Sequence, residues 1–284
     1  MNPFDESVKD NLDARLSDLE KEFNSDVIFF YGPIYNGMFK LFRDFIETLV
    51  CDKDKRETLT IFLNTPGGSV ETVEKVVRII RYHYDYVNIV VPDMAMSAGT
   101  IFCMAGDKIF MDYSSSLGPI DPQVYNGKEW VPAQGYLDKV EELIQKSRDD
   151  CITKAEFLIL QTQDLAVLRA YEQAKNLTVT LLKEWLVSFK FKDWEQHKNG
   201  TVVTREEKII RAEEVAKLLG DNTIWHSHGR MLGIDTLENV LKLKIENYTD
   251  NKTLHKKIRT YNDLTTEFIA RREYPSYFHS RNYF

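Results

Sequence analysis

The chain has 284 residues, 43% of them hydrophobic, and a formal net charge of -7. This length and apolar fraction predict a folded protein with one large domain, or one domain with a helical appendage. Lys and Arg total 37 against 44 Asp and Glu, so the basic excess of a nucleic-acid surface is missing and no nucleic-acid partner is expected. The apolar runs are far shorter than the roughly 20 residues that cross a bilayer, so no membrane span is expected.

The cysteines and the first six residues indicate the cellular compartment in which the protein is expected. Cys51, Cys103 and Cys151 are odd in number and lack metal-ligand spacing, which predicts reduced thiols with no disulfide and no metal. No cofactor is expected. The segment from Met1 to Glu6 is acidic, without the positive leader and apolar run of a signal peptide, so we expect a cytoplasmic protein.

The first half of the chain alternates short β-branched runs with amphipathic segments, which is typical of βαβ units around a mostly parallel sheet. Strands are predicted at 27–32, 58–64, 88–92 and 108–112. Helices are predicted between them at 38–50 and 70–84, where apolar residues recur every three or four positions.

Beyond Pro132 the strand signal fades. Helical patterns follow at 133–147, 153–189, 205–219, 236–242 and 251–270. The charged stretch from Lys190 to Gly200 is predicted to be a solvated linker. The aromatic and basic tail, Tyr274 to Phe284, either docks on a neighbouring subunit or is disordered, and the sequence leaves both open.

Paired glycines, Gly67 and Gly68, stand between the second predicted strand and the helix after it. Glycines at such a turn let backbone N–H groups approach a ligand closely, which suits an oxyanion hole. A tight turn with Ser69 as helix cap explains the same residues, because a Gly-Gly pair alone is weakly specific.

Ser97 follows the third predicted strand, at the start of a small apolar helix. A serine on a sharp turn, with its own N–H and that of Ala98 close by, suits acyl transfer. A plain helix cap is an equally good explanation of Ser97 alone. The Gly67-Gly68 loop favours the nucleophile, because both loops lie at the carboxyl ends of strands, where open α/β sheets place ligands.

The chain resembles the serine dehydrogenase proteinase family, which is related to signal peptide peptidase A and, more distantly, to the proteolytic subunit of Clp. The resemblance covers about residues 24–245 and includes Trp225 to Arg230. Its motifs are Asn64-Thr65-Pro66-Gly67-Gly68-Ser69, Met96-Ser97-Ala98-Gly99-Thr100, Ala105-Gly106-Asp107 and Leu117-Gly118-Pro119-Ile120-Asp121-Pro122-Gln123.

The resemblance implies an α/β, Clp-protease/crotonase-like fold: a mostly parallel sheet with flanking helices and a helical C-terminal part. It implies Ser97 as nucleophile, with the N–H groups of Gly67, Gly68 and Ala98 in the oxyanion hole. Three regions are expected: an N-terminal helical extension at 1–24, the peptidase domain at 25–245, and a C-terminal helix and aromatic tail at 246–284.

The general base is where the sequence departs from the Clp subunit. Asp121 stands where that relative has its histidine; it is expected to orient a base, to bind a substrate amide, or to be a turn residue before Pro122. Signal peptide peptidase A uses a Ser-Lys dyad, and Lys175 interrupts a mainly apolar helical stripe. Lys175 is therefore the predicted base, or it reaches solvent from the stripe's edge. Lys139 and Lys154 are the alternatives.

His226 and His228 flank Ser227 after Trp225, and without a carboxylate or cysteine at ligand spacing a structural role is expected for them. The leading expectation is an ATP-independent serine endopeptidase that acts on peptides or unfolded proteins and assembles into a homo-oligomeric ring. An acyl-CoA-binding crotonase-like enzyme and an inactive oligomeric scaffold are the competing hypotheses.

Overall fold

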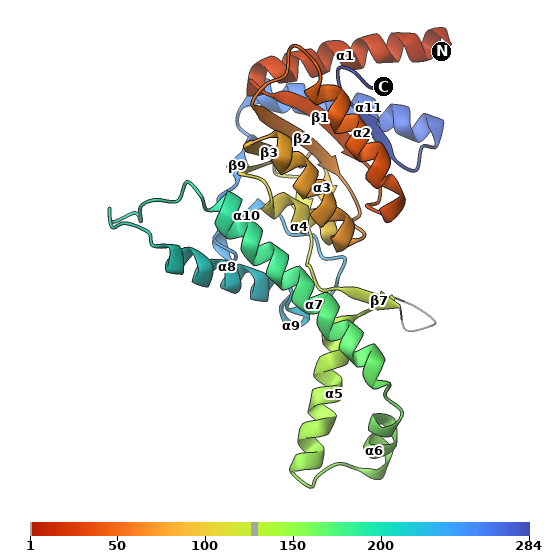
Figure 1. Ribbon diagram of the computed structural model, residues 1–284, viewed down its shortest axis with the longest axis vertical. Coiled ribbons are helices and arrows are strands. Elements are labelled where there is room, and N and C mark those ends of the chain that lie inside the picture. The colour runs from red at the N-terminus through yellow and green to blue at the C-terminus, as the bar shows by residue number, and fades with distance from the viewer. Residues whose placement is uncertain (1, 126–129) are drawn as a thin grey trace.

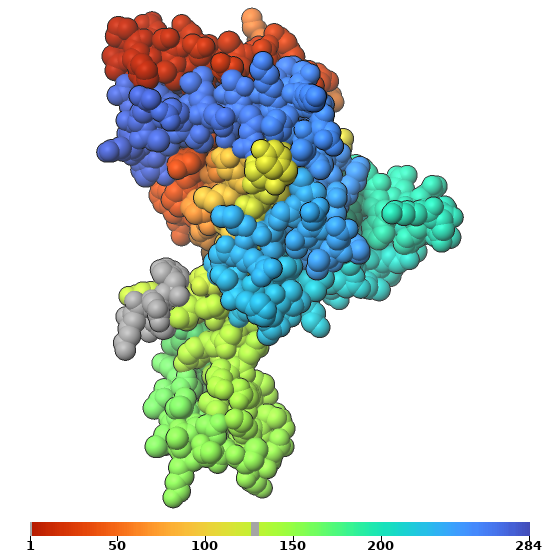
Figure 2. Space-filling model, turned by 180° about the vertical axis from the view of Figure 1, so that it is seen from behind, coloured from red at the N-terminus to blue at the C-terminus, as the bar shows by residue number. Residues whose placement is uncertain are grey.

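A six-stranded sheet with helices on both faces forms the body of the protein, and a helical arm projects from it (Figures 1 and 2). The computed structural model describes residues 2–125 and 130–284. The strand order is β10-β1-β2-β3-β5-β9, and neighbouring strands are parallel except for β10 with β1. The predicted α/β class with a mostly parallel sheet is confirmed.

The sheet comprises β1 (Asp26–Tyr31), β2 (Thr58–Asn64), β3 (Tyr86–Val90), β5 (Lys108–Met111), β9 (Glu246–Asn247) and β10 (Tyr277–His279). Two small ladders pair β4 (Met94–Ala95) with β6 (Ser116–Leu117), and β7 (Gln123–Tyr125) with β8 (Trp130–Pro132).

The α-helices are α1 (Pro3–Phe23), α2 (Phe39–Val50), α3 (Val70–His83), α4 (Ala98–Met104), α5 (Ala133–Arg148), α6 (Lys154–Gln161), α7 (Leu165–Trp185), α8 (Arg205–Leu219), α9 (Asn222–Trp225), α10 (Ile234–Asn239) and α11 (Lys252–Arg272). Shorter helical turns are the 3-10 segment η1 (Asn36–Met38) and the π-helix η2 (Leu186–Lys190).

Alternate residues of the central strands face two separate cores, because side chains of a strand point to opposite faces in turn. Ile28 and Phe30 of β1 belong to the larger core, under α2, α3 and α4. Val27 and Phe29 belong to the second core, under α1 and α11. The chain's first and last long helices therefore lie side by side on one face of the sheet (Figures 1 and 2).

The four strands predicted in the first half each lie within two residues of an observed strand. The predicted helix at 153–189 is wrong as a single element. It divides into α6, α7 and η2 because the Asp164 carboxylate accepts the N–H groups of Ala166 and Val167 and so begins a new helix.

Neither alternative for the C-terminal tail is correct. Tyr277–His279 form β10, which pairs antiparallel with β1 of the same chain, so the tail completes the sheet. Phe278 stacks on Phe30 with ring centroids 5.1 Å apart. The aromatic character of the tail therefore serves the chain's own core.

The predicted solvated linker is also only partly correct. Phe191 is buried, and burial lowers the pKa of Lys190 to about 8. Lys190 ends η2 and Phe191 caps it, so this end of the segment belongs to the folded body. In the described part of the chain, no helix is both long and apolar enough to cross a membrane.

Candidate active site

Ser97 lies between β4 and α4 in a conformation that residues with a Cβ rarely adopt. Its φ is 52° and its ψ is −116°. Such a backbone costs on the order of 1–3 kcal/mol and persists only where its surroundings enforce it. The Ser97 side chain makes no capping hydrogen bond to α4 and is partly exposed. Its Oγ therefore remains available for chemistry.

The Gly67-Gly68 loop supplies the surroundings that hold Ser97. The two glycines have φ of 101° and 143°. A Cβ on Gly67 would lie 2.6 Å from the Met96 carbonyl oxygen and 2.9 Å from Ser97 Cβ, and one on Gly68 would lie 2.0 Å from the Ile34 carbonyl oxygen. Only glycine fits at either position, for reasons of both conformation and space.

Two of the three predicted oxyanion donors are free to bind. The Gly67 N–H donates to Thr65 Oγ1 at 3.0 Å and is thus already used. Gly68 and Ile34 form a parallel β-bridge, in which the Ile34 N–H donates to the Gly67 carbonyl and the Ser69 N–H donates to the Ile34 carbonyl, both at 2.8 Å. The N–H of Gly68 itself therefore points away from Ile34. Within residues 2–125 and 130–284, the N–H groups of Gly68 and Ala98 have no hydrogen-bond acceptor.

A groove runs past Ser97 between the sheet ends and α7. Its lining is mainly apolar, and among its described residues there is no lysine or arginine. The lining residues are Ile34, Tyr35, Asn36, Pro66, Gly68, Ser69, Val70, Glu71, Ser97, Ile101, Ile120, Pro122, Gln123, Ala174, Leu177, Thr178 and His228.

His228 lines the groove and lies beside a buried carboxylate. Its Nδ1 lies 2.8 Å from Asp121 Oδ1, and Asp121 is 2% exposed. Asp121 Oδ2 accepts a hydrogen bond from Gln123 Nε2 at 2.8 Å. The carboxylate that sequence spacing did not reveal beside His228 is thus Asp121, 107 residues earlier in the chain.

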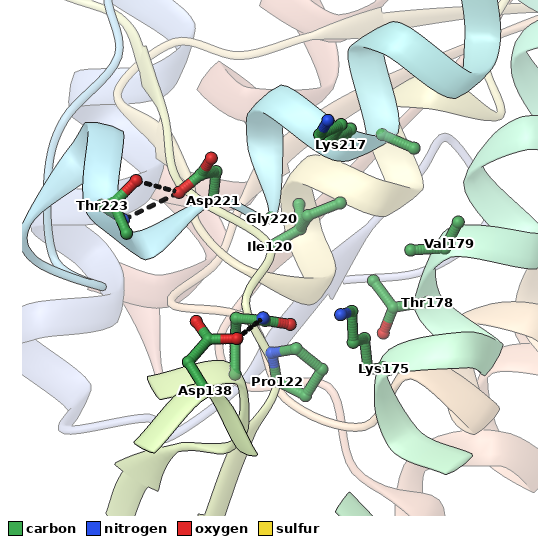
Figure 3. Close-up of a pocket in the computed structure, with 12 residues that line it drawn as sticks. Ile120, Pro122, Asp138, Lys175, Thr178, Val179, Lys217, Gly220, Asp221 and Thr223 are labelled. Carbon is green, nitrogen blue, oxygen red and sulfur yellow. Dashed lines mark hydrogen bonds between the residues drawn. The ribbon is translucent and has the colours of Figure 1, made fainter. Parts of the chain in front are cut away.

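Lys175 does not line the groove; it lines an adjoining cavity (Figure 3). The figure shows Lys175 and Thr178 extending from α7 into this cavity, opposite Pro122. The cavity also holds the carboxylates of Asp138 and Asp221. Thr178, one turn after Lys175, lines both spaces, so this side of α7 borders the groove as well as the cavity.

The two alternative lysines lie on the arm that projects from the body and contains α5 and α6 (Figure 1). Lys139, on α5, is exposed and forms an ion pair with Glu142 at 2.8 Å. Lys154, at the start of α6, is exposed. Neither is among the groove residues. Burial lowers the pKa of Lys190 to about 8, but Lys190 is not among the groove residues either.

Asp93 connects the glycine loop and the loop of Ser97 through hydrogen bonds near the start of each loop. Its Oδ2 accepts hydrogen bonds from the side-chain amides of Asn64 and Asn262, both at 2.8 Å. Asn64 precedes the glycine loop, and Asp93 precedes the strand that leads to Ser97. Arg259 of α11 bonds to Asp93 Oδ1 at 3.2 Å and also to the buried Asp112. The second core's helix therefore braces both loops.

Cys51, Cys103 and Cys151 are free thiols. No group of three His, Cys, Asp or Glu side chains in the described part of the chain is arranged to hold a metal ion.

The family of ClpP-like SDH-type serine proteinases matches residues 26–229, and the chain belongs to this family. The match contains Ser97, the glycine loop, Asp121 and His228.

Two curated relatives come from Methanocaldococcus jannaschii. The uncharacterised protein MJ0137 is 31% identical over 192 residues, which cover 66% of this chain and 56% of the relative. The uncharacterised protein MJ1495 is 28% identical over 94 residues, which cover 33% of this chain and 31% of that protein. The chain thus spans about half or less of the length of these relatives.

Similar solved structures include two mutant forms of a membrane-bound stomatin-specific protease. The first is 15% identical with a TM-score of 0.46, covering 82% of this chain and 84% of that one. The second, in complex with a substrate peptide, is 17% identical with a TM-score of 0.46, covering 82% and 80%.

Proposed function

We propose that the protein is a serine peptidase that forms an acyl-enzyme on Ser97. The observation that carries this proposal is the convergence of a strained, uncapped Ser97 with two unpaired amides, those of Gly68 and Ala98. A strained serine with free backbone donors beside it is the arrangement that acyl transfer requires. Membership of the serine proteinase family supports the same chemistry.

In the proposed reaction the Ser97 Oγ attacks the carbonyl carbon of a peptide bond. The carbonyl oxygen becomes an oxyanion, which the Gly68 and Ala98 N–H groups stabilise. The C–N bond then breaks, the amine leaves with a proton, and water hydrolyses the Ser97 ester to release the acid.

The groove indicates the kind of substrate. Aliphatic side chains from five different segments line it, namely Ile34, Val70, Ile101, Ile120 and Leu177. Burying one aliphatic substrate side chain there is worth about 1.5–3 kcal/mol. We therefore propose internal cleavage of peptides or unfolded proteins beside apolar residues. A groove without lysine or arginine among its described residues offers no basic rim for coenzyme A.

Three finer features stay proposals. The sequence contains no GxxxxGK[ST] phosphate loop, which supports activity without ATP. Phe157, Leu158 and Ile159 of the arm are each more than half exposed, and such a patch supports assembly into a homo-oligomeric ring. The Ser-Lys dyad with Lys175 remains a prediction, because Lys175 comes from the helix that supplies groove residues but lines the neighbouring cavity.

A fluorophosphonate probe tests the proposal directly, because it phosphonylates activated serines. We expect the full-length protein to be labelled once, at Ser97, and to cleave an unstructured peptide; Ser97→Ala should abolish both. Absence of labelling in the assembled wild-type protein, or labelling that survives in Ser97→Ala, would contradict the proposal.

A further inference from the structure

We propose that the Lys175 cavity is a subsite of the groove that binds a carboxylate of the substrate, from an acidic side chain or from a C-terminus. The inference rests on the proposed peptidase activity and adds one polar recognition site to its apolar groove. It gives the Lys175 ammonium a binding role, whereas the Ser-Lys dyad needs that lysine neutral. The observations behind it are the common border of the two spaces and the unpartnered lysines of the cavity.

The cavity and the groove that passes Ser97 share part of their lining. Ile120, Pro122 and Thr178 border both, so the two spaces meet at these three side chains. The cavity volume is about 260 Å³, whereas one water molecule needs on the order of 10–15 Å³. A side chain of a substrate that lies in the groove therefore has room in the cavity.

Two lysines bring positive charge to the cavity without partners of their own. Lys175 extends from α7, as Figure 3 shows, and Lys217 belongs to α8, which packs against α7. Within the described part of the chain, neither ammonium group forms a hydrogen bond or an ion pair. By contrast, Lys183 of α7 is paired with Glu213 of α8. A lysine ammonium has three donors and no acceptor, so Lys175 and Lys217 are open to an anion.

Thr178 adds a neutral donor where the two spaces meet. The residue is 3% exposed, and its hydroxyl has no hydrogen-bond partner among residues 2–125 and 130–284. A buried hydroxyl without a partner costs free energy, so a ligand that supplies the acceptor would explain its position. Thr178 follows Lys175 by three positions, which places both on the same face of α7.

The carboxylates of the cavity are already engaged by their neighbours. Asp221 caps α9, and its Oδ1 accepts the Thr223 hydroxyl at 2.6 Å and the Thr223 N–H at 2.8 Å. The hydrogen bond from the hydroxyl, above all, lowers the pKa of Asp221. Asp138 is exposed and accepts a hydrogen bond from the Gln134 amide. The unpartnered charges of the cavity are thus cations, which favours an anionic ligand.

A carboxylate is the anion that a peptide brings to such a site. It only accepts hydrogen bonds, so it matches the lysine ammonium groups and the Thr178 hydroxyl. Hydrogen bonds between ionised partners are about twice as strong as neutral ones. The subsite should therefore favour glutamate over glutamine, which has nearly the same size but no charge.

The test compares kcat/KM of the full-length protein for paired peptides that differ by one charge. In one arm, glutamate replaces glutamine at each position around the cleaved bond in turn. In the other arm, a free C-terminal carboxylate replaces an amide. We expect at least one replacement to raise kcat/KM about tenfold. The preference should weaken as the salt concentration rises, because Lys217 is exposed.

Lys175→Met removes the charge but keeps most of the length of the side chain. It should lower the acid-to-neutral ratio of kcat/KM at least about threefold, and Lys217→Met should lower it less, because an exposed charge contributes less. Lys175→Glu should reverse the preference in favour of a peptide with lysine at that position. The ratio is the readout because loss of a general base would slow both peptides equally.

Lys183→Met is the matched control, because Lys183 lies on α7 but does not line the cavity. Its acid-to-neutral ratio should equal that of the wild type. A wild-type ratio near one in both arms, a preference for cationic side chains, or a ratio that Lys175→Met leaves unchanged would overturn the inference. Labelling of Ser97 by the fluorophosphonate would then leave the proposed function standing. Absence of both labelling and cleavage in the wild type would instead refute the proposed function, and the subsite with it.

Discussion

The Ser97 groove and the adjoining Lys175 cavity share α7 but are built differently. The groove's reactive part is backbone: a strained serine, two glycines at positive φ and loops braced by buried polar contacts. The polar groups of the cavity belong to side chains instead, and two of these side chains, Lys217 and Asp138, are exposed to solvent. Preorganised dipoles stabilise developing charge because they need not rearrange during the reaction, so the groove is the place suited to catalysis.

The largest expected effect comes from adding one methyl group to the groove. Gly68→Ala would place a Cβ 2.0 Å from the Ile34 carbonyl oxygen at a φ of 143°, and the loop must move. We expect labelling of Ser97 to become undetectable and the free energy of unfolding to fall by about 3 kcal/mol or more. Probe labelling and urea unfolding measure these effects.

Gly233→Ala is the matched control, because nothing lies within 4 Å of a Cβ there and its φ is negative. If Gly68→Ala labels as well as Gly233→Ala, the groove does not depend on the glycine loop.

A smaller effect, on the free energy of unfolding alone, is expected for the contact between Arg259 and the buried carboxylate of Asp112. Burial would raise the pKa of Asp112, but hydrogen bonds from the Ser114 N–H and from Arg259 outweigh it and hold the pKa below 3.8. A lowered pKa in the folded state stabilises the fold above the unfolded value, and this contribution disappears as pH falls through the folded value. Arg259→Gln should therefore lower stability by about 3 kcal/mol at pH 7.

The pH dependence makes this prediction specific. The difference in thermal midpoint between wild type and Arg259→Gln should be largest near neutral pH and should shrink below about pH 4, as Asp112 becomes protonated. Lys217→Gln, in the exposed cavity, should change stability by less than about 0.5 kcal/mol. A pH-independent difference for Arg259→Gln would mean that Asp112 is not the group involved.

The smallest expected effect is a gain in stability of one Ser97 variant over another. Ser97→Gly relieves the positive φ, whereas Ser97→Ala keeps it, so the glycine variant should be about 1 kcal/mol more stable than the alanine variant. Thermal unfolding of the two inactive proteins measures the difference. A glycine variant that is the less stable of the two would show that the Ser97 backbone is not strained.

Local sequence determined much of this molecule. Alternating β-branched and amphipathic runs located the four central strands, because periodicity reports which face each residue buries. The glycine pair and the small residues around Ser97 predicted two tight loops, and the structure places these loops against each other, with Gly67 packed on Met96 and Ser97. The break at Asp164 was missed because the apolar pattern continues on both sides of it.

Only the tertiary structure showed that Asp121 and His228 form a pair and that His228 lines the same groove as Ser97. Lys175 interrupts an apolar stripe in the sequence, and that stripe proved to face a cavity beside the groove as well as the groove itself. His228 and Asp121 gave no joint signal, because 107 residues separate them and their meeting depends on the Leu117–Leu232 bridge. Sequence periodicity records burial along one element, whereas the hydrogen bond that orients His228 is a contact between two loops distant in the chain.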